Sequence, residues 1–171
     1  IYAVSKFLDR EDNFNGFTVG IIDDLTNLSI EPVDFGYKSS NHEILIYGFG
    51  SDGMVSASKD ILTLVNEAHG KYVQGYFEYD SKKSGGVTIS HLRIGDKPIN
   101  APYYVQNPEI IVITKDEYFK HYDMLSDAKN GAYVLINTIK NEEELNKIIP
   151  EDVKKIIKEK STYKCSYIIY V

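Results

Sequence analysis

Three glycines, Gly48, Gly50 and Gly53, stand in the spacing G-x-G-x-x-G within the stretch "GFGSDG". The apolar run "EILIYGF" leads into them, and apolar residues at helical spacing follow from Met54, so the glycines are predicted to lie between a strand and a helix. Glycines in that position let the backbone approach an anion closely, and the first N–H groups of the helix, which we expect Ser51 to cap, point toward the anion. The pattern predicts a phosphate-binding loop, with a simple tight turn as the alternative.

The residues that follow argue against a dinucleotide ligand. A site for NAD needs an acid about 20 residues beyond the glycines, at the end of the next strand, to bind the ribose. Glu78 and Asp80 come later than that, and Lys82 and Lys83 follow them at once. Asp52, at the expected helix start, would also repel a pyrophosphate. The arrangement fits a phosphate carried on a longer arm better than it fits NAD.

The stretch "DSKKSGG" is a second candidate site. Lys82 and Lys83 stand among small residues after a predicted strand, so we expect a positively charged loop that faces the same crevice as the glycine loop. The alternative is a solvated hairpin turn, because lysines are common at protein surfaces. Arg93, on the following strand, either adds a third cation or pairs with Asp96.

Other residue types offer no catalytic or metal site in this sequence. The four histidines fall in different predicted elements without metal-ligand spacing, and the adjacent acids Asp23 and Asp24 are expected to be solvated. Cys165 lies in the last apolar run and is expected to pack. Because no nucleophile, base and orienting group can be assembled, the chain is predicted to be a binding domain.

The order of predicted elements indicates an open α/β sheet. Apolar runs predict strands at 43–49, 71–80, 85–95, 108–114, 132–138 and 162–171, and periodic segments predict helices at 54–65, 116–130, 141–149 and 150–160. Asp116 is the expected N-cap of the second helix. Strands joined through helices are expected to be parallel neighbours. Residues 1–40, ending in a turn-rich stretch, are expected to precede a compact domain at 41–171.

Composition excludes several classes of function. The formal charge of −6 over 171 residues lacks the basic surplus of a nucleic-acid-binding protein. A single cysteine excludes an internal disulfide and an iron–sulfur cluster held within this chain, and it suggests a reducing cytoplasm. We expect neither a membrane span nor a signal peptide, because no apolar run is long enough.

Three stretches carry a resemblance to a known family. "GFGSDGMVSASKDI", "YVQGYFEYDSKKSGGVTISHLRIGDKPI" and "YDMLSDAKNGAYVLINT" together resemble the gamma region of pyruvate:ferredoxin (flavodoxin) oxidoreductases, from about Ile44 to the C-terminus. "GFTVGIIDDLTNLSI" is similar to the segment that precedes this region in single-chain members. The resemblance implies a Rossmann-like, mostly parallel sheet with flanking helices. It also implies that residues 1–40 are a remnant or linker from a preceding thiamine-enzyme domain.

The resemblance further implies a role. The parent enzyme would oxidise pyruvate with coenzyme A and reduce ferredoxin or flavodoxin, using thiamine diphosphate, magnesium and iron–sulfur clusters held by other domains of a homodimer. This chain alone lacks those motifs and is expected to be inactive and to bind none of these cofactors. Taken with the local charge, the resemblance assigns the coenzyme A phosphates to two segments. One is the glycine loop (Gly50, Ser51, Asp52, Gly53 and Met54), and the other is the lysine pair (Lys82 and Lys83). A purely structural domain and a free-standing NAD-binding protein are the alternatives.

Overall fold

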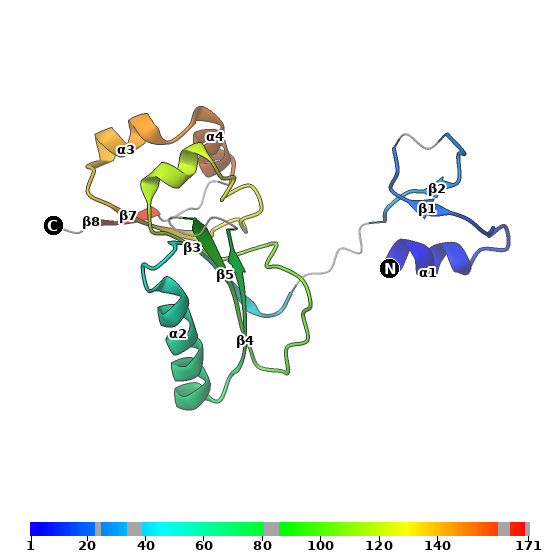
Figure 1. Ribbon diagram of the computed structural model, residues 1–171, viewed down its shortest axis with the longest axis horizontal. Helices are drawn as coiled ribbons and strands as arrows, with labels where there is room; N and C mark the ends of the chain where they lie inside the picture. The colour runs from blue at the N-terminus through cyan, green and yellow to red at the C-terminus, as the bar shows by residue number, and fades with distance from the viewer. Residues whose placement is uncertain (23–24, 34–38, 81–85, 161–164, 170–171) are drawn as a thin grey trace. The chain divides into compact units, whose positions relative to one another are not determined.

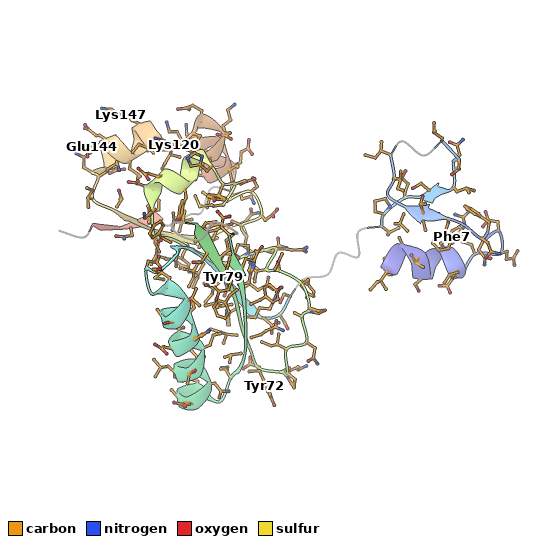
Figure 2. All side chains as sticks on the ribbon, in the orientation of Figure 1. Phe7, Tyr72, Tyr79, Lys120, Glu144 and Lys147 are labelled. Carbon is orange, nitrogen blue, oxygen red and sulfur yellow. The ribbon has the colours of Figure 1, made fainter. Side chains whose placement is uncertain are left out.

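The computed structural model describes residues 1–22, 25–33, 39–80, 86–160 and 165–169 (Figure 1). The chain forms two compact units, Ile1–Ser39 and Ser40–Val171. The first unit contains helix α1 (Tyr2–Leu8) and the short parallel strands β1 (Thr18–Val19) and β2 (Ser29–Ile30). Its small core centres on Phe7, labelled in Figure 2, whose ring lies 4.9 Å from that of Phe14 and 4.7 Å from that of Phe17. Its origin as a remnant of a preceding domain stays a prediction.

The second unit is a six-stranded sheet in the order β4-β5-β3-β6-β7-β8. Strands β3, β6, β7 and β8 are parallel, whereas β5 pairs antiparallel with both β3 and β4. The prediction of a mostly parallel α/β sheet with flanking helices is therefore confirmed. The elements are β3 (His42–Phe49), α2 (Met54–His69), β4 (Tyr72–Tyr79), β5 (Val87–Gly95), β6 (Ile110–Ile113), η1 (Asp116–Lys120), β7 (Tyr133–Thr138), α3 (Glu142–Ile148), α4 (Glu151–Glu159) and β8 (Cys165–Ile169).

Alternating residues of the central strand β3 contribute to two separate cores. Leu45 and Tyr47 join the larger cluster, which also contains residues of η1, α3 and α4. Ile46 faces the other way and packs with Leu62 of α2 and Leu92 of β5. Figure 1 accordingly shows α2 along one face of β3, β4 and β5, with the connection between β5 and β6 on the other side. Since successive strand residues point to opposite faces, one strand supports both layers.

Local sequence explains where the helices begin and end. Gly70 ends α2 with a left-handed φ of 61°, and its N–H donates to the carbonyl of Asn66. Asn141 caps α3 by accepting from the Glu144 N–H, while the Glu144 side chain accepts from the Asn141 N–H. This capping box satisfies backbone donors that a helix N-terminus leaves unpaired.

The prediction of a helix over residues 116–130 is wrong. Only Asp116–Lys120 is helical, as a 3-10 turn, and Lys115 rather than Asp116 stands at the cap position. The Asp123 carboxylate accepts hydrogen bonds from the backbone N–H groups of Leu125 and Ser126. Side-chain bonds of this kind offer the backbone an alternative to the helix ladder, and this one holds the segment in a turn.

None of the helices in the described part of the chain is long and apolar enough to cross a bilayer.

Candidate ligand-binding site

The glycine loop connects the carboxyl end of β3 to the start of α2, as predicted from the sequence. Gly53 adopts a φ of 83° and stands at the N-cap position of α2. Ser51 adopts a φ of 79°, a left-handed conformation that costs a residue with a Cβ about 1–2 kcal/mol. Strain of this kind clusters at ligand-binding sites, so it marks the loop as a candidate site. Ser51 does not cap the helix, contrary to the prediction.

The Asp52 carboxylate holds the loop together. It accepts hydrogen bonds from the backbone N–H groups of Phe49 (2.6 Å) and Met54 (2.9 Å) and from the hydroxyl of Thr114 (3.2 Å). An acid at this position interacts favourably with the positive end of the helix dipole. The Met54 N–H, assigned from the sequence to a phosphate, thus has an acceptor within the protein. Asp52 also connects the loop to the end of β6, through Thr114.

The hairpin between β4 and β5 reaches the same end of the sheet. The Gly50 N–H donates to the Gly86 carbonyl at 2.9 Å, and the Asp80 N–H donates to the Val87 carbonyl at 3.1 Å. Lys82 and Lys83 lie outside the described residues, within the gap at 81–85. The residues on both sides of that gap are described, and the structure brings one of them, Gly86, into contact with the glycine loop.

Two lysines that sequence reasoning missed lie at the same sheet end. Lys115 follows β6, and its Nζ lies 3.5 Å from the ring centroid of Phe49, the last residue of β3. Lys140 follows β7, and its Nζ donates to Asp116 at 2.7 Å. Each comes one or two residues after a buried strand, a position at which ligands bind in open α/β sheets. A lysine shortly after a predicted buried strand is the sequence signal that could have identified both residues.

A pocket of about 320 Å³ lies between the carboxyl ends of β6 and β7. Its lining residues include both cations and several polar groups: Thr114, Lys115, Asp116, Asn137, Thr138 and Lys140. The Asn137 amide donates to the Thr114 carbonyl at 3.3 Å, which connects the two strand ends. Glu117 lines the same pocket, so its two lysines lie beside two carboxylates, and Lys115 is the lysine that also contacts Phe49, next to the glycine loop.

Arg93 does not belong to this site, nor does it pair with Asp96. Its Nε donates to Glu43 at 2.8 Å, and both side chains are almost fully buried at the start of β3. Asp96 pairs with Lys71. Because β5 runs antiparallel to β3, Arg93 lies near the opposite end of β3 from the glycine loop.

Asp116 makes the stability of this sheet end dependent on pH. Burial opposes its ionisation, but hydrogen bonds from Lys140 and Thr138 outweigh burial and hold the pKa of Asp116 below its ordinary value. A depressed carboxyl pKa contributes stability that is present above the ordinary value of 3.8 and is lost as the pH falls through the lower folded-state pKa.

We expect Asp116→Asn to flatten the acid side of the stability curve. Urea unfolding at a series of pH values should show the parent chain losing stability below pH 3.8 more steeply than the variant. Glu117→Gln, at the exposed neighbouring position, is the control and should leave the slope unchanged. Parallel curves for the parent chain and Asp116→Asn would contradict the assignment.

Among the described residues, no cluster of three or more histidine, cysteine, aspartate or glutamate side chains has an arrangement that could hold a metal.

Comparison with known proteins places the chain in a family. The family described as "Pyruvate ferredoxin/flavodoxin oxidoreductase" matches residues 43–169. The chain is 38% identical over 160 residues to the pyruvate-flavodoxin oxidoreductase of Klebsiella pneumoniae, an alignment that covers 92% of this chain and 14% of that protein. It is 40% identical over 146 residues to the pyruvate:ferredoxin oxidoreductase of Moorella thermoacetica, covering 84% of this chain and 12% of that protein. The chain therefore spans about one seventh or less of these relatives.

Solved structures show the same fold. A pyruvate oxidoreductase subunit from Thermotoga maritima is 28% identical with a TM-score of 0.51, over 64% of this chain and 56% of that one. The gamma subunit of a keto/oxoacid ferredoxin oxidoreductase from Geobacter sulfurreducens has a TM-score of 0.51 at 18% identity, over 77% of this chain and 62% of that one, and it is similar in fold alone. The similarities do not favour a purely structural domain or a free-standing NAD-binding protein.

Proposed function

Because this chain belongs to the pyruvate ferredoxin/flavodoxin oxidoreductase family, we propose that it is the gamma domain of a longer enzyme that converts pyruvate and coenzyme A to acetyl-coenzyme A and carbon dioxide. Ferredoxin or flavodoxin would accept the electrons, as the names of the two relatives suggest. The small share of each relative that the chain covers supports a contribution to binding rather than a complete active site.

The part proposed for this domain is to bind the phosphates of coenzyme A. The observation that carries it is the hydrogen bond from the Gly50 N–H to the Gly86 carbonyl, because it joins the glycine loop to one flank of the lysine-containing segment. The backbone of Gly50, Ser51, Asp52, Gly53 and Met54 forms the proposed close-approach surface. Because the N–H groups of Gly50, Asp52 and Met54 donate within the protein, those of Ser51 and Gly53 are the proposed donors to the phosphate. Lys82 and Lys83 supply the charge that two or more phosphates require.

Two features of the described loop refine this proposal. Asp52 accepts the Met54 N–H, so the carboxylate shapes the helix start, and the phosphate has to approach from the side of Ser51 and Gly53. Lys115 lies against Phe49 and offsets the negative charge of Asp52. We include Lys115 as an additional contact for the nucleotide end of the substrate.

The redox cofactors belong to other parts of the proposed enzyme. One cysteine cannot supply the ligands of an iron–sulfur cluster, so the clusters, like thiamine diphosphate and magnesium, would be held by domains outside this chain. Those domains are its proposed partners, within a homodimer in the cytoplasm.

The experiment replaces both lysines, Lys82→Ala with Lys83→Ala, in the longer enzyme. The KM for coenzyme A should rise by about tenfold or more, because hydrogen bonds between charged groups contribute about 1.5–3 kcal/mol each, while the KM for pyruvate stays unchanged. The matched control, Lys147→Ala with Lys158→Ala, removes two exposed lysines from α3 and α4 and should change neither value. An unaltered dependence on coenzyme A in the first variant would refute the proposed role.

A further inference from the structure

A second pocket lies on the opposite face of the sheet from α2, away from the glycine loop. It has a volume of about 280 Å³ and is covered by the connection between β5 and β6 rather than by a helix. Its walls are mostly apolar and are formed by Leu45, Ile89, Val105, Pro108 and Met124. Such walls suit an aliphatic chain.

Three carboxylates line the same pocket. Glu78 comes from the edge strand β4, whereas Asp123 and Asp127 come from the turn that follows η1. None of the described lining residues is a lysine or an arginine. Lys160 donates to the Ser126 carbonyl beside the pocket and interacts with Asp123, but three carboxylates against one lysine still favour a cation over a phosphate or a carboxylate.

Tyr47 gives an independent indication of a ligand. The residue is only 7% exposed and lines the pocket, yet no described residue makes a hydrogen bond to its hydroxyl. Burial, followed by the charges of Asp123, Glu78 and Asp127, raises the pKa of Tyr47 to about 12, and all three carboxylates line the same pocket as Tyr47. The hydroxyl oxygen is not among the fully buried atoms that lack a partner, so it is open to the pocket and available to a ligand there.

His91 cannot neutralise these charges, because both of its ring nitrogens are already engaged. Nδ1 accepts the Val105 N–H at 3.1 Å, so the proton is on Nε2, which donates to Glu78. Burial lowers the pKa of His91, so the ring is neutral at pH 7. Tyr104 stacks on this ring at 4.6 Å, and the edge of Tyr76 packs against Tyr104. The aromatic side of the pocket is therefore held in a fixed arrangement.

We propose that this pocket binds an alkylammonium group, with the methylene chain against the apolar walls and the ammonium hydrogens donated to the carboxylates and the Tyr47 oxygen. Ammonium supplies three donors and no acceptor, which matches a pocket rich in acceptors. The described carboxylates form no metal-binding group, so an organic cation fits better than a divalent metal. A lysine side chain and a free aliphatic amine share this chemistry.

The test titrates the 171-residue chain with n-butylammonium and, separately, with Nα-acetyl-lysine N-methylamide. Nuclear magnetic resonance of labelled tyrosine rings is the readout, and Tyr47→Phe assigns the Tyr47 signal. We expect saturable shifts of Tyr47 and Tyr104 with a dissociation constant of about 1 mM, and none with n-butanol. Binding of both amines would identify a site that admits a lysine side chain, and binding of n-butylammonium alone would identify a site for a free amine.

Variants separate specific binding from general attraction to an acidic protein. Asp127→Asn should weaken n-butylammonium binding by about threefold or more, because it removes one charge-assisted acceptor. Asp60→Asn removes an exposed carboxylate from α2, across the sheet, and should have no effect. Absence of saturable shifts with either amine, or equal effects of the two variants, would overturn the proposal.

Discussion

Replacing Glu43 with alanine is expected to lower the free energy of unfolding by about 3–5 kcal/mol, because it leaves a buried guanidinium without its counter-charge. Arg93 is 1% exposed, and its Nε donates to Glu43 at 2.8 Å. Its NH1 donates to Gln74 at 3.2 Å, and NH2 has no partner among the described residues. Gln74, the other hydrogen-bond partner of Arg93, is neutral and cannot replace the charge of Glu43. A loss of this size is a large fraction of the total stability of a typical domain.

Urea unfolding monitored by circular dichroism would measure this loss. Glu43→Ala combined with Arg93→Met should recover much of the stability, since the unpaired charge is removed and an apolar side chain of similar length takes its place. Asp96→Ala, which breaks the exposed pair with Lys71, is the surface control and should cost much less than Glu43→Ala. If Glu43→Ala cost no more than Asp96→Ala, the buried pair would not have the role assigned to it.

Replacing Gly48 with alanine is expected to cost about 1–3 kcal/mol through overpacking. A Cβ at this position would lie 2.7 Å from the Thr88 hydroxyl oxygen, 3.1 Å from the Met54 Cβ and 3.3 Å from an Asp52 carboxylate oxygen. The first of these separations is shorter than real Cβ contacts. Either the Thr88 side chain or the backbone of β3 must therefore shift, and a shift of the backbone would also weaken ligand binding at the loop.

Two further variants identify the cause. In a Thr88→Ala background the main clash is absent, and Gly48→Ala should then cost clearly less. Gly53→Ala meets no atom within 4 Å, so its cost should come from the left-handed φ of 83° alone, about 1–2 kcal/mol. A cost for Gly48→Ala that is unaffected by Thr88→Ala would show that close contact is not the reason for glycine at this position.

The periodic apolar pattern predicted most elements of the second unit. Hydrophobic spacing and cap residues were enough to predict the strand into the glycine loop, helix α2 and, apart from residues 116–130, the alternation of strands and helices toward the C-terminus. The apolar residues of these segments are continuous or recur at the helix period. The antiparallel pairing of β4 and β5 could also have been predicted from the sequence. Their short connection, from Asp80 to Gly86, has no room for the crossover that parallel strands require.

Interactions between distant residues were not predictable from spacing. The pairing of Arg93 with Glu43 joins residues 50 positions apart, and a local rule favoured Asp96 instead. Residues 118–128 have buried apolar side chains at helical spacing, but the Asp123 carboxylate takes the backbone N–H groups that a helix would use. The position of Lys115 over Phe49 likewise depends on the register of β3 and β6.

The central strand β3 fixes the geometry of more than the core. It is hydrogen-bonded along both edges, to β5 and to β6. A change of its register would therefore break hydrogen bonds to both neighbouring strands. Tyr47 lines the pocket that contains Glu78, Asp123 and Asp127, and the next residue, Gly48, is the first glycine of the G-x-G-x-x-G stretch. Adjacent residues of one strand thus connect the proposed ammonium site with the proposed phosphate site, so β3 would act as a rigid spacer of constant length between the two.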